Sequence, residues 1–120
     1  MAVRKVLVVD DTPVAIKKLE EVISKAGIQV IAASSGTEAI RLAKSTTPDL
    51  IFMDIVMPDM DGFAACRQLK KDSATNMIPI VFVSSKDQKA DRIWAQLQGG
   101  NAYITKPFSA EEILEQIRLF

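Results

Sequence analysis

The 120-residue sequence contains no histidine and only one cysteine, Cys66. Histidine is the commonest metal ligand and general base in proteins, so its absence argues against zinc sites and against Ser-His catalysis. A single cysteine cannot form an internal disulfide, which suits a reducing compartment. We therefore expect a cytoplasmic protein without zinc chemistry.

An excess of one charge is also lacking, because 15 basic residues balance 15 acidic ones. Nucleic acid is therefore not an expected partner. The apolar runs are only a few residues long, and the opening residues MAVRKVLVV lack the apolar region of a signal peptide. We expect no membrane insertion. The length fits one domain over residues 1–120, with nothing left for an attached output domain.

Short apolar runs alternate with helical patterns along the whole sequence. Several runs are apolar at successive positions, as expected for strands that are covered on both faces. We expect strands at Lys5–Val9, Gln29–Ala33, Leu50–Met53, Ile80–Val83 and Ala102–Thr105.

The segments between these strands carry helical signals. We expect helices from Pro13 to a stop at Gly27, at Thr37–Lys44, at about Phe63–Lys71, at about Gln88–Gln98, and from Ser109 to Leu119. Three of them begin with capping signals, which are Thr12 before Pro13, Ser35 with Glu38, and Ser109 with Glu112. The fourth helix has an apolar stripe of Ala90, Ile93, Trp94 and Leu97. For Trp94 we expect packing on the core first and contact with a partner protein second.

This alternation of strand and helix predicts an α/β fold. Parallel strands need covering crossovers of one hand, so a doubly wound five-stranded sheet with five helices should form a three-layer sandwich. In such sheets, ligands bind beyond the carboxyl ends of the strands. The residues that follow each strand are therefore the candidates for a functional site.

Polar residues follow four of the five predicted strands. Asp10 and Asp11 follow the first strand, Asp54 follows the third, Ser84 the fourth and Lys106 the fifth. Each residue has an ordinary explanation when taken alone: a helix cap, a turn residue or a solvated lysine. Their convergence at one rim of the sheet favours a functional site.

The charges of this rim indicate its chemistry. Three neighbouring carboxylates repel one another and need counter-charge, which Lys106 supplies only in part. Mg²⁺ prefers such oxygen ligands together with a phosphate oxygen, so we expect Asp10 and Asp11 to hold a magnesium ion. Beside a cation and Lys106, Asp54 could act as a nucleophile that accepts a phosphoryl group, and Ser84 could donate a hydrogen bond to it.

The motifs VLVVDD, DLIFMDIVMPDMDG, IVFVSS and YITKPF resemble the receiver domain of bacterial response regulators, of the single-domain CheY-like kind. The resemblance implies a flavodoxin-like sheet with strand order 2-1-3-4-5. It also implies roles for individual residues. Asp54 would be the phosphoacceptor, and the Mg²⁺ ligands would be Asp10, Asp11, Asp54 and the Val56 carbonyl. The switch would consist of Ser84, Tyr103 and Lys106, and the bond between Lys106 and Pro107 would be cis.

The same resemblance implies partners in a two-component phosphorelay. The donor would be a histidine kinase or a histidine phosphotransfer protein. A downstream protein would bind the face made by the fourth helix, the fifth strand and the last helix. The stretch VSSKDQKADRIWAQLQGGNAYITKPF also resembles receivers of type IV pilus twitching-motility systems. We expect a monomer or weak dimer that is not a metabolic enzyme.

Three other functions remain as alternatives. A flavodoxin-type ligand-binding domain would need a glycine- and hydroxyl-rich loop after the first strand, whereas this sequence has DDTPVA. A haloacid-dehalogenase-like phosphatase would have a second aspartate where Thr12 stands. A phosphorylation-independent interaction module on the same fold would not need the intact acidic pair, Asp54 and Lys106.

Overall fold

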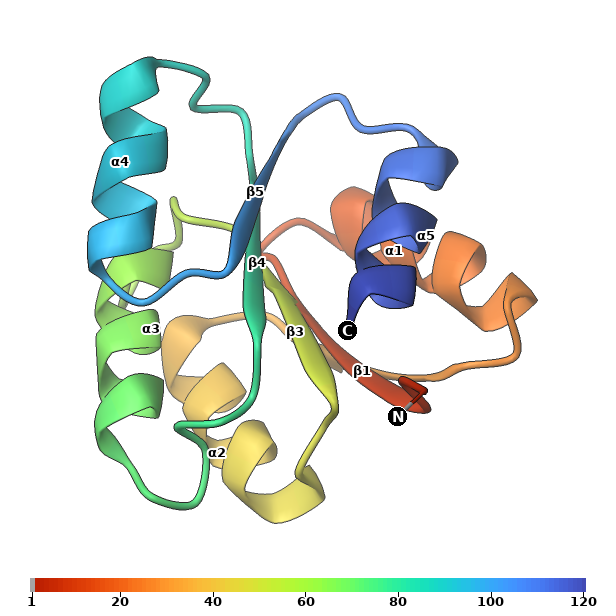
Figure 1. The fold of residues 1–120 in the computed structure, drawn as a ribbon, viewed down its shortest axis with the longest axis horizontal. Coiled ribbons are helices and arrows are strands. Elements are labelled where there is room, and N and C mark those ends of the chain that lie inside the picture. The colour runs from red at the N-terminus through yellow and green to blue at the C-terminus, as the bar shows by residue number, and fades with distance from the viewer. Residues whose placement is uncertain (1) are drawn as a thin grey trace.

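The computed structural model describes residues 2–120, which form five strands and five helices in strict alternation (Figure 1). In chain order these are β1 (Lys5–Val9), α1 (Pro13–Lys25), β2 (Gln29–Ala33), α2 (Gly36–Thr46), β3 (Leu50–Met53), α3 (Gly62–Lys71), β4 (Ile80–Ser84), α4 (Lys89–Leu97), β5 (Ala102–Thr105) and α5 (Ala110–Leu119). The predicted strand bounds hold, except that β4 extends by one residue to Ser84.

The strands form one parallel sheet in the order β2-β1-β3-β4-β5. Every residue of β3 and β4 is buried, as predicted for central strands with helices on both faces. The fold class is therefore confirmed as a doubly wound, three-layer α/β sandwich. Its strand order reverses between β1 and β3, which is where ligands bind in folds of this type.

Helices cover the two faces of the sheet in unequal groups. Figure 1 shows α2, α3 and α4 on one side and α1 and α5 on the other. The side chains of successive strand residues point to opposite faces, and two apolar clusters result. Leu7, Ile51 and Phe82 pack with the first group of helices, whereas Val8 and Phe52 pack with the second.

The predicted helix ends are partly correct. Ser109 and Glu112 form the expected capping box, and Gly27 adopts a positive φ just beyond α1. Ser35 accepts from the backbone of Glu38, but the Glu38 carboxylate accepts from Ser34 instead of Ser35. Thr12 is the N-cap residue of α1 and Pro13 follows it in the first turn, as predicted, but the Thr12 side chain makes no capping bond.

The first expectation for Trp94, that it packs on the core with the apolar stripe of α4, is wrong. Ile93, Trp94 and Leu97 are 50%, 52% and 68% exposed, and the buried residue of this helix is Ala95. Ala95 packs on the apolar cluster that contains the rings of Phe82 and Tyr103, and the larger apolar side chains of the helix face outward.

The two ends of the described chain lie close together. Ala2, Val3 and Phe120 line one surface pocket at the amino end of β1, away from the carboxyl ends of the strands. Among the helices formed by residues 2–120, none combines the length and apolar character needed to cross a bilayer.

Candidate functional site

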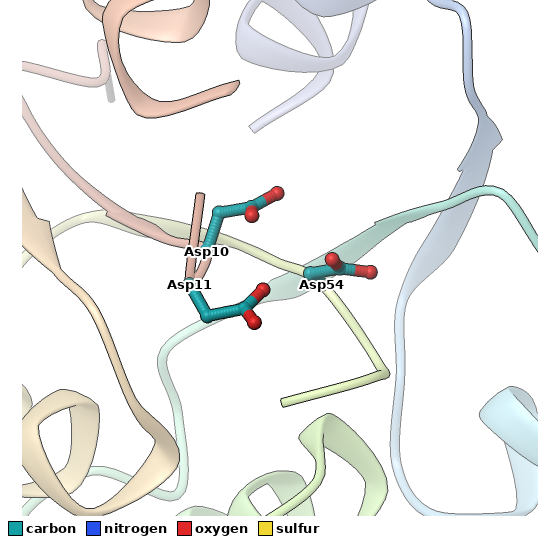
Figure 2. Close-up of side chains that lie close together, drawn as sticks. All are labelled: Asp10, Asp11 and Asp54. Carbon is teal, nitrogen blue, oxygen red and sulfur yellow. The ribbon is translucent and has the colours of Figure 1, made fainter. Parts of the chain in front are cut away.

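Three carboxylates lie close together at the carboxyl ends of the strands. Asp10 directly follows β1 and Asp54 directly follows β3, and the backbone N–H of Asp54 still donates to Val9 at 2.9 Å. One oxygen from each of Asp10, Asp11 and Asp54 lies within 4.8 Å of the others. Figure 2 shows the side chains of Asp10, Asp11 and Asp54 close together at the ends of the strands. Such a set of hard oxygen donors fits a divalent cation of the Mg²⁺ type.

The carboxylates differ in their surroundings. Asp10 is 1% exposed and one of its oxygens accepts from the backbone and hydroxyl of Thr12, both at 2.9 Å. Asp54 is 8% exposed and accepts from the backbone N–H of Ile55 at 2.7 Å. Asp11 is exposed. Asp10 is therefore held rigidly, whereas Asp11 is free to meet a ligand from solvent.

Lys106 bridges two of these carboxylates. Its ammonium lies 2.6 Å from Asp10 and 3.3 Å from Asp54, and its side chain is 23% exposed. It is therefore not the solvated surface lysine of the ordinary interpretation. Its backbone N–H donates to the carbonyl of Ser84 at 2.8 Å, and the Lys106–Pro107 peptide bond is cis.

The pKa values of Asp54 and Lys106 reflect burial and the contacts between these charged groups. Burial raises the pKa of Asp54 above its ordinary value, Lys106 opposes this rise, and the nearby Asp10 adds to it. Burial alone would lower the pKa of Lys106, but its hydrogen bond to Asp10 and the charge of Asp54 raise it above the ordinary value. One ammonium thus faces three carboxylates, and a further cation would relieve the repulsion among them.

The loop after β3 is fastened tightly beneath Asp54. The backbone N–H of Gly62 donates to Ile55 at 2.7 Å, and a Cβ on Gly62 would lie 2.1 Å from the carbonyl oxygen of Asp54. Glycine is therefore required for this close approach. Met57 is buried below the loop, while the side chain of Val56 is exposed. Buried and exposed side chains thus alternate along this loop, and Val56 lies at the surface beside the acidic cluster.

The remaining predicted residues, Ser84 and Tyr103, meet at one residue of the β4–α4 loop. The buried Ser84 hydroxyl accepts from the backbone N–H of Lys86 at 3.2 Å. The Tyr103 hydroxyl donates to the Lys86 carbonyl at 2.7 Å. Burial raises the pKa of the Tyr103 phenol, and the neighbouring Ser84 hydroxyl opposes that rise. Both side chains therefore hold the same loop residue.

Sequence reasoning missed two residues of this region. The Thr12 hydroxyl holds Asp10, although its position before Pro13 indicated a helix cap. Arg92 contacts Tyr103 and Thr105 across α4 and β5, although it resembles any solvated arginine of a helix. The Thr12 contact is local, since an aspartate often accepts from the residue two positions later, whereas no local pattern marks the Arg92 contact, which joins α4 to β5.

Comparison with known sequences gives an independent result. Residues 6–118 match the family described as the response regulator receiver domain. Protein PilH of Pseudomonas aeruginosa is 43% identical over 113 residues, which cover 94% of this chain and 93% of that relative. Protein PilG of the same organism is 39% identical over 114 residues, which cover 95% of this chain and 84% of that relative.

Solved structures agree with this match. The chemotaxis protein CheY4 of Vibrio cholerae has a TM-score of 0.92 at 27% identity, covering 98% of each chain. The receiver domain of the sensor histidine kinase PA1611 of Pseudomonas aeruginosa, which has a magnesium ion coordinated in its active site cleft, has a TM-score of 0.90 at 28% identity, covering 98% of this chain and 97% of that one. With its sequence matched almost from end to end and its fold shared, this chain belongs to the response regulator receiver domain family.

Proposed function

We propose that this receiver domain accepts a phosphoryl group on Asp54 in a Mg²⁺-dependent reaction and so switches a surface that binds other proteins. Receiver domains are phosphoacceptor switches that interact with histidine kinases and downstream targets. The observation that carries the proposal is the Lys106 ammonium, which bridges Asp10 and Asp54 inside the acidic cluster.

Asp10, Asp11, Asp54 and the backbone carbonyl of Val56 would hold the magnesium ion. When bound, Mg²⁺ would supply two positive charges that neutralise the oxygens of the entering phosphoryl group. The similar PA1611 receiver domain, with its coordinated magnesium ion, supports this assignment. The two partly buried hydrogen bonds from Thr12 to Asp10 would keep one carboxylate in place whether or not the ion is present.

Transfer would proceed from a phosphohistidine of a histidine kinase or a histidine phosphotransfer protein. A carboxylate oxygen of Asp54 forms the new P–O bond while the P–N bond of the donor breaks, and its electron pair returns to the imidazole nitrogen. Lys106 lies where it can stabilise the charge on the phosphoryl oxygens, which is the main catalytic task in such transfers. The chain thus assists its own modification and is not an enzyme acting on a separate substrate.

Ser84, Tyr103 and Lys106 would carry the switch. A phosphoryl group on Asp54 adds negative charge that Lys106 and the Ser84 hydroxyl can both bind. Because Ser84 and Tyr103 hold the same residue of the β4–α4 loop, a change at Ser84 can reach the face formed by α4, β5 and α5. This face would bind the downstream protein.

We also propose a place for the switch in chemotaxis or motility control. The similarity to PilH and PilG, and to a chemotaxis protein in structure, supports this role. We propose that residues 1–120 form a single receiver domain. It would act in the cytoplasm as a monomer or weak dimer.

The proposal is tested with acetyl phosphate and Mg²⁺, followed by intact mass. We expect one acid-labile phosphoryl group per chain, abolished in Asp54→Asn and by EDTA. Asp87→Asn, which changes an exposed aspartate of the same rim, should accept phosphate normally. An unmodified wild-type chain under these conditions, or an Asp54→Asn variant that is still modified, would contradict the proposal.

A second variant separates acceptance from switching. Lys106→Ala should still accept the phosphoryl group but respond poorly, because the amine that senses the added charge is missing. Trp94 fluorescence on addition of acetyl phosphate measures the response. A Lys106→Ala variant that responds like wild type would show that Lys106 has another role.

A further inference from the structure

Arg92 is bound to two side chains of β5. Its Nη2 atom donates to the Thr105 hydroxyl at 2.6 Å, and its Cζ atom lies 5.0 Å from the centre of the Tyr103 ring. Tyr103 and Thr105 are two positions apart on the strand, so their side chains project from the same face of the sheet. One guanidinium thus stacks on a ring and binds a hydroxyl at the same time.

These contacts matter because α4 has few others. Ala95 is the buried side chain of the helix, and the larger apolar side chains Ile93, Trp94 and Leu97 face outward. At its carboxyl end the helix is followed by Gln98, which accepts from Arg67 of α3 at 2.6 Å. In the middle of the helix, Arg92 supplies the polar attachment to β5.

From Arg92 a short series of contacts leads to the phosphoacceptor. The Tyr103 ring under the guanidinium ends in a hydroxyl that donates to the Lys86 carbonyl at 2.7 Å. The backbone N–H of Lys86 donates to the Ser84 hydroxyl at 3.2 Å. A hydroxyl can donate and accept at once, so Ser84 can keep this bond while it donates its hydrogen to a phosphoryl oxygen.

We infer that Arg92 is a positioning residue that holds Tyr103 and the Lys86 peptide in the arrangement that presents the Ser84 hydroxyl to a phosphoryl group on Asp54. The inference rests on the proposed function and assigns it a regulatory contact on α4. A planar guanidinium suits this task better than an ammonium, because it stacks and forms a directed hydrogen bond together.

The coupling between the Arg92 contact and phosphoryl binding must be reciprocal. If Arg92 favours the arrangement that binds a phosphoryl group, phosphoryl binding must favour the contact between Arg92 and Tyr103 by the same factor. A partner that draws Arg92 away from β5 would therefore weaken phosphoryl binding. The exposed guanidinium can be reached by such a partner, because Arg92 lines an open groove of about 300 Å³ between α4 and β5.

Beryllofluoride, a phosphoryl mimic, tests the inference when it is titrated by calorimetry in the presence of Mg²⁺. We expect Arg92→Met to weaken beryllofluoride binding about threefold to tenfold, the range of one cation–π contact with its hydrogen bond. Arg92→Lys should be intermediate, since it keeps a cation over the ring. Binding of Mg²⁺ alone should be unchanged in both variants, because Arg92 does not touch the carboxylates.

Two controls distinguish positioning from simpler effects. Lys89→Met removes the same charge from the same helix and should bind beryllofluoride like wild type. In a Tyr103→Leu background, Arg92→Met should cause no further loss, because the ring through which it acts is missing. Thermal unfolding of each variant shows that the fold is retained.

Equal beryllofluoride affinity in wild type and Arg92→Met would overturn the inference while leaving the proposed function intact. An equal loss in Lys89→Met, or an undiminished loss in the Tyr103→Leu background, would also overturn it. A wild-type chain that binds Mg²⁺ but no beryllofluoride would contradict the proposed function itself, and the inference would fall with it.

Discussion

Helices α3 and α4 cover the same face of the sheet but bury very different side chains. In α3, Ala65, Cys66 and Leu69 are at most 1% exposed. In α4, the buried residue is Ala95, while Trp94 and Leu97 are more than half exposed. Both helices are amphipathic in sequence, so the difference comes from what lies beneath them.

The two helices therefore differ in role: α3 is a fixed support, whereas α4 is an element that can respond. The loop before α3 carries Asp54 and Val56, and its tight contact at Gly62 depends on α3 staying in place. By contrast, α4 is attached through Arg92, Ala95 and its carboxyl end. Segments with few buried apolar contacts open and move at the lowest free energy. The loop that carries the phosphoacceptor is thus held rigidly by α3, whereas the surface proposed to bind partners includes the more loosely attached α4.

The largest expected contrast is in the reactivity of thiols. Cys66 of α3 is fully buried and its Sγ atom contacts the Gln98 carbonyl at 3.3 Å, so it should react with a disulfide reagent only when the protein opens. We expect its reaction to be about a thousandfold slower than in urea-unfolded protein. A Cys66→Ala, Leu97→Cys variant, with its thiol on α4, should react at nearly the unfolded rate. Equal rates for the two positions would remove the distinction between the helices.

The same thiol makes stability depend on pH. Burial raises the pKa of Cys66 from 9.0 to about 11, so the native state holds the thiol proton more tightly than the unfolded chain does between these values. The free energy of unfolding should therefore fall as the pH rises from about 9 to about 11. Urea unfolding across this range measures the fall, and in Cys66→Ala the contribution of the thiol should be missing.

A matched pair of substitutions gives the next largest effect. Leu69→Ala leaves a cavity in a fully packed region and should lower the free energy of unfolding by about 2–5 kcal/mol. Leu97→Ala removes an exposed side chain and should change it by less than about 0.5 kcal/mol. Urea unfolding followed by circular dichroism measures both. A large loss in Leu97→Ala would mean that α4 packs more tightly than its exposure indicates.

The smallest expected effect concerns Trp94. Because the indole is 52% exposed in the native state, its emission should shift only slightly toward the red when the protein unfolds. Acrylamide should quench it almost as well in the native as in the unfolded protein. A strong blue-shifted native emission would show that Trp94 is covered in solution, and the comparison with α3 would then need revision.

The sequence was sufficient to predict the sheet. Uninterrupted apolar runs such as Leu50–Met53 mark strands buried on both faces, and their bounds follow from where the apolar residues stop. The carboxyl ends of parallel strands share one edge, so the gathering of Asp10, Asp54 and Lys106 followed from the same pattern.

The sequence was not sufficient to predict which side of α4 is buried. An apolar stripe shows that one side of a helix avoids water, but the space beneath the helix decides what fits there. Here Ala95 packs on the cluster that contains Phe82 and Tyr103, and Trp94 stays outside it. The contact between Arg92 and Tyr103 could not be predicted either, because it joins α4 to β5, and these elements meet only in the folded protein.

The neighbouring chain ends have a practical consequence for building sensors from this molecule. Ala2 and Phe120 share a pocket at the opposite edge of the sheet from Asp54, so a fluorescent protein fused at either end would stand clear of an approaching donor. A short linker could also join the two ends, and new ends opened beside Trp94 would place a fused reporter on α4, the helix that we propose responds to phosphorylation.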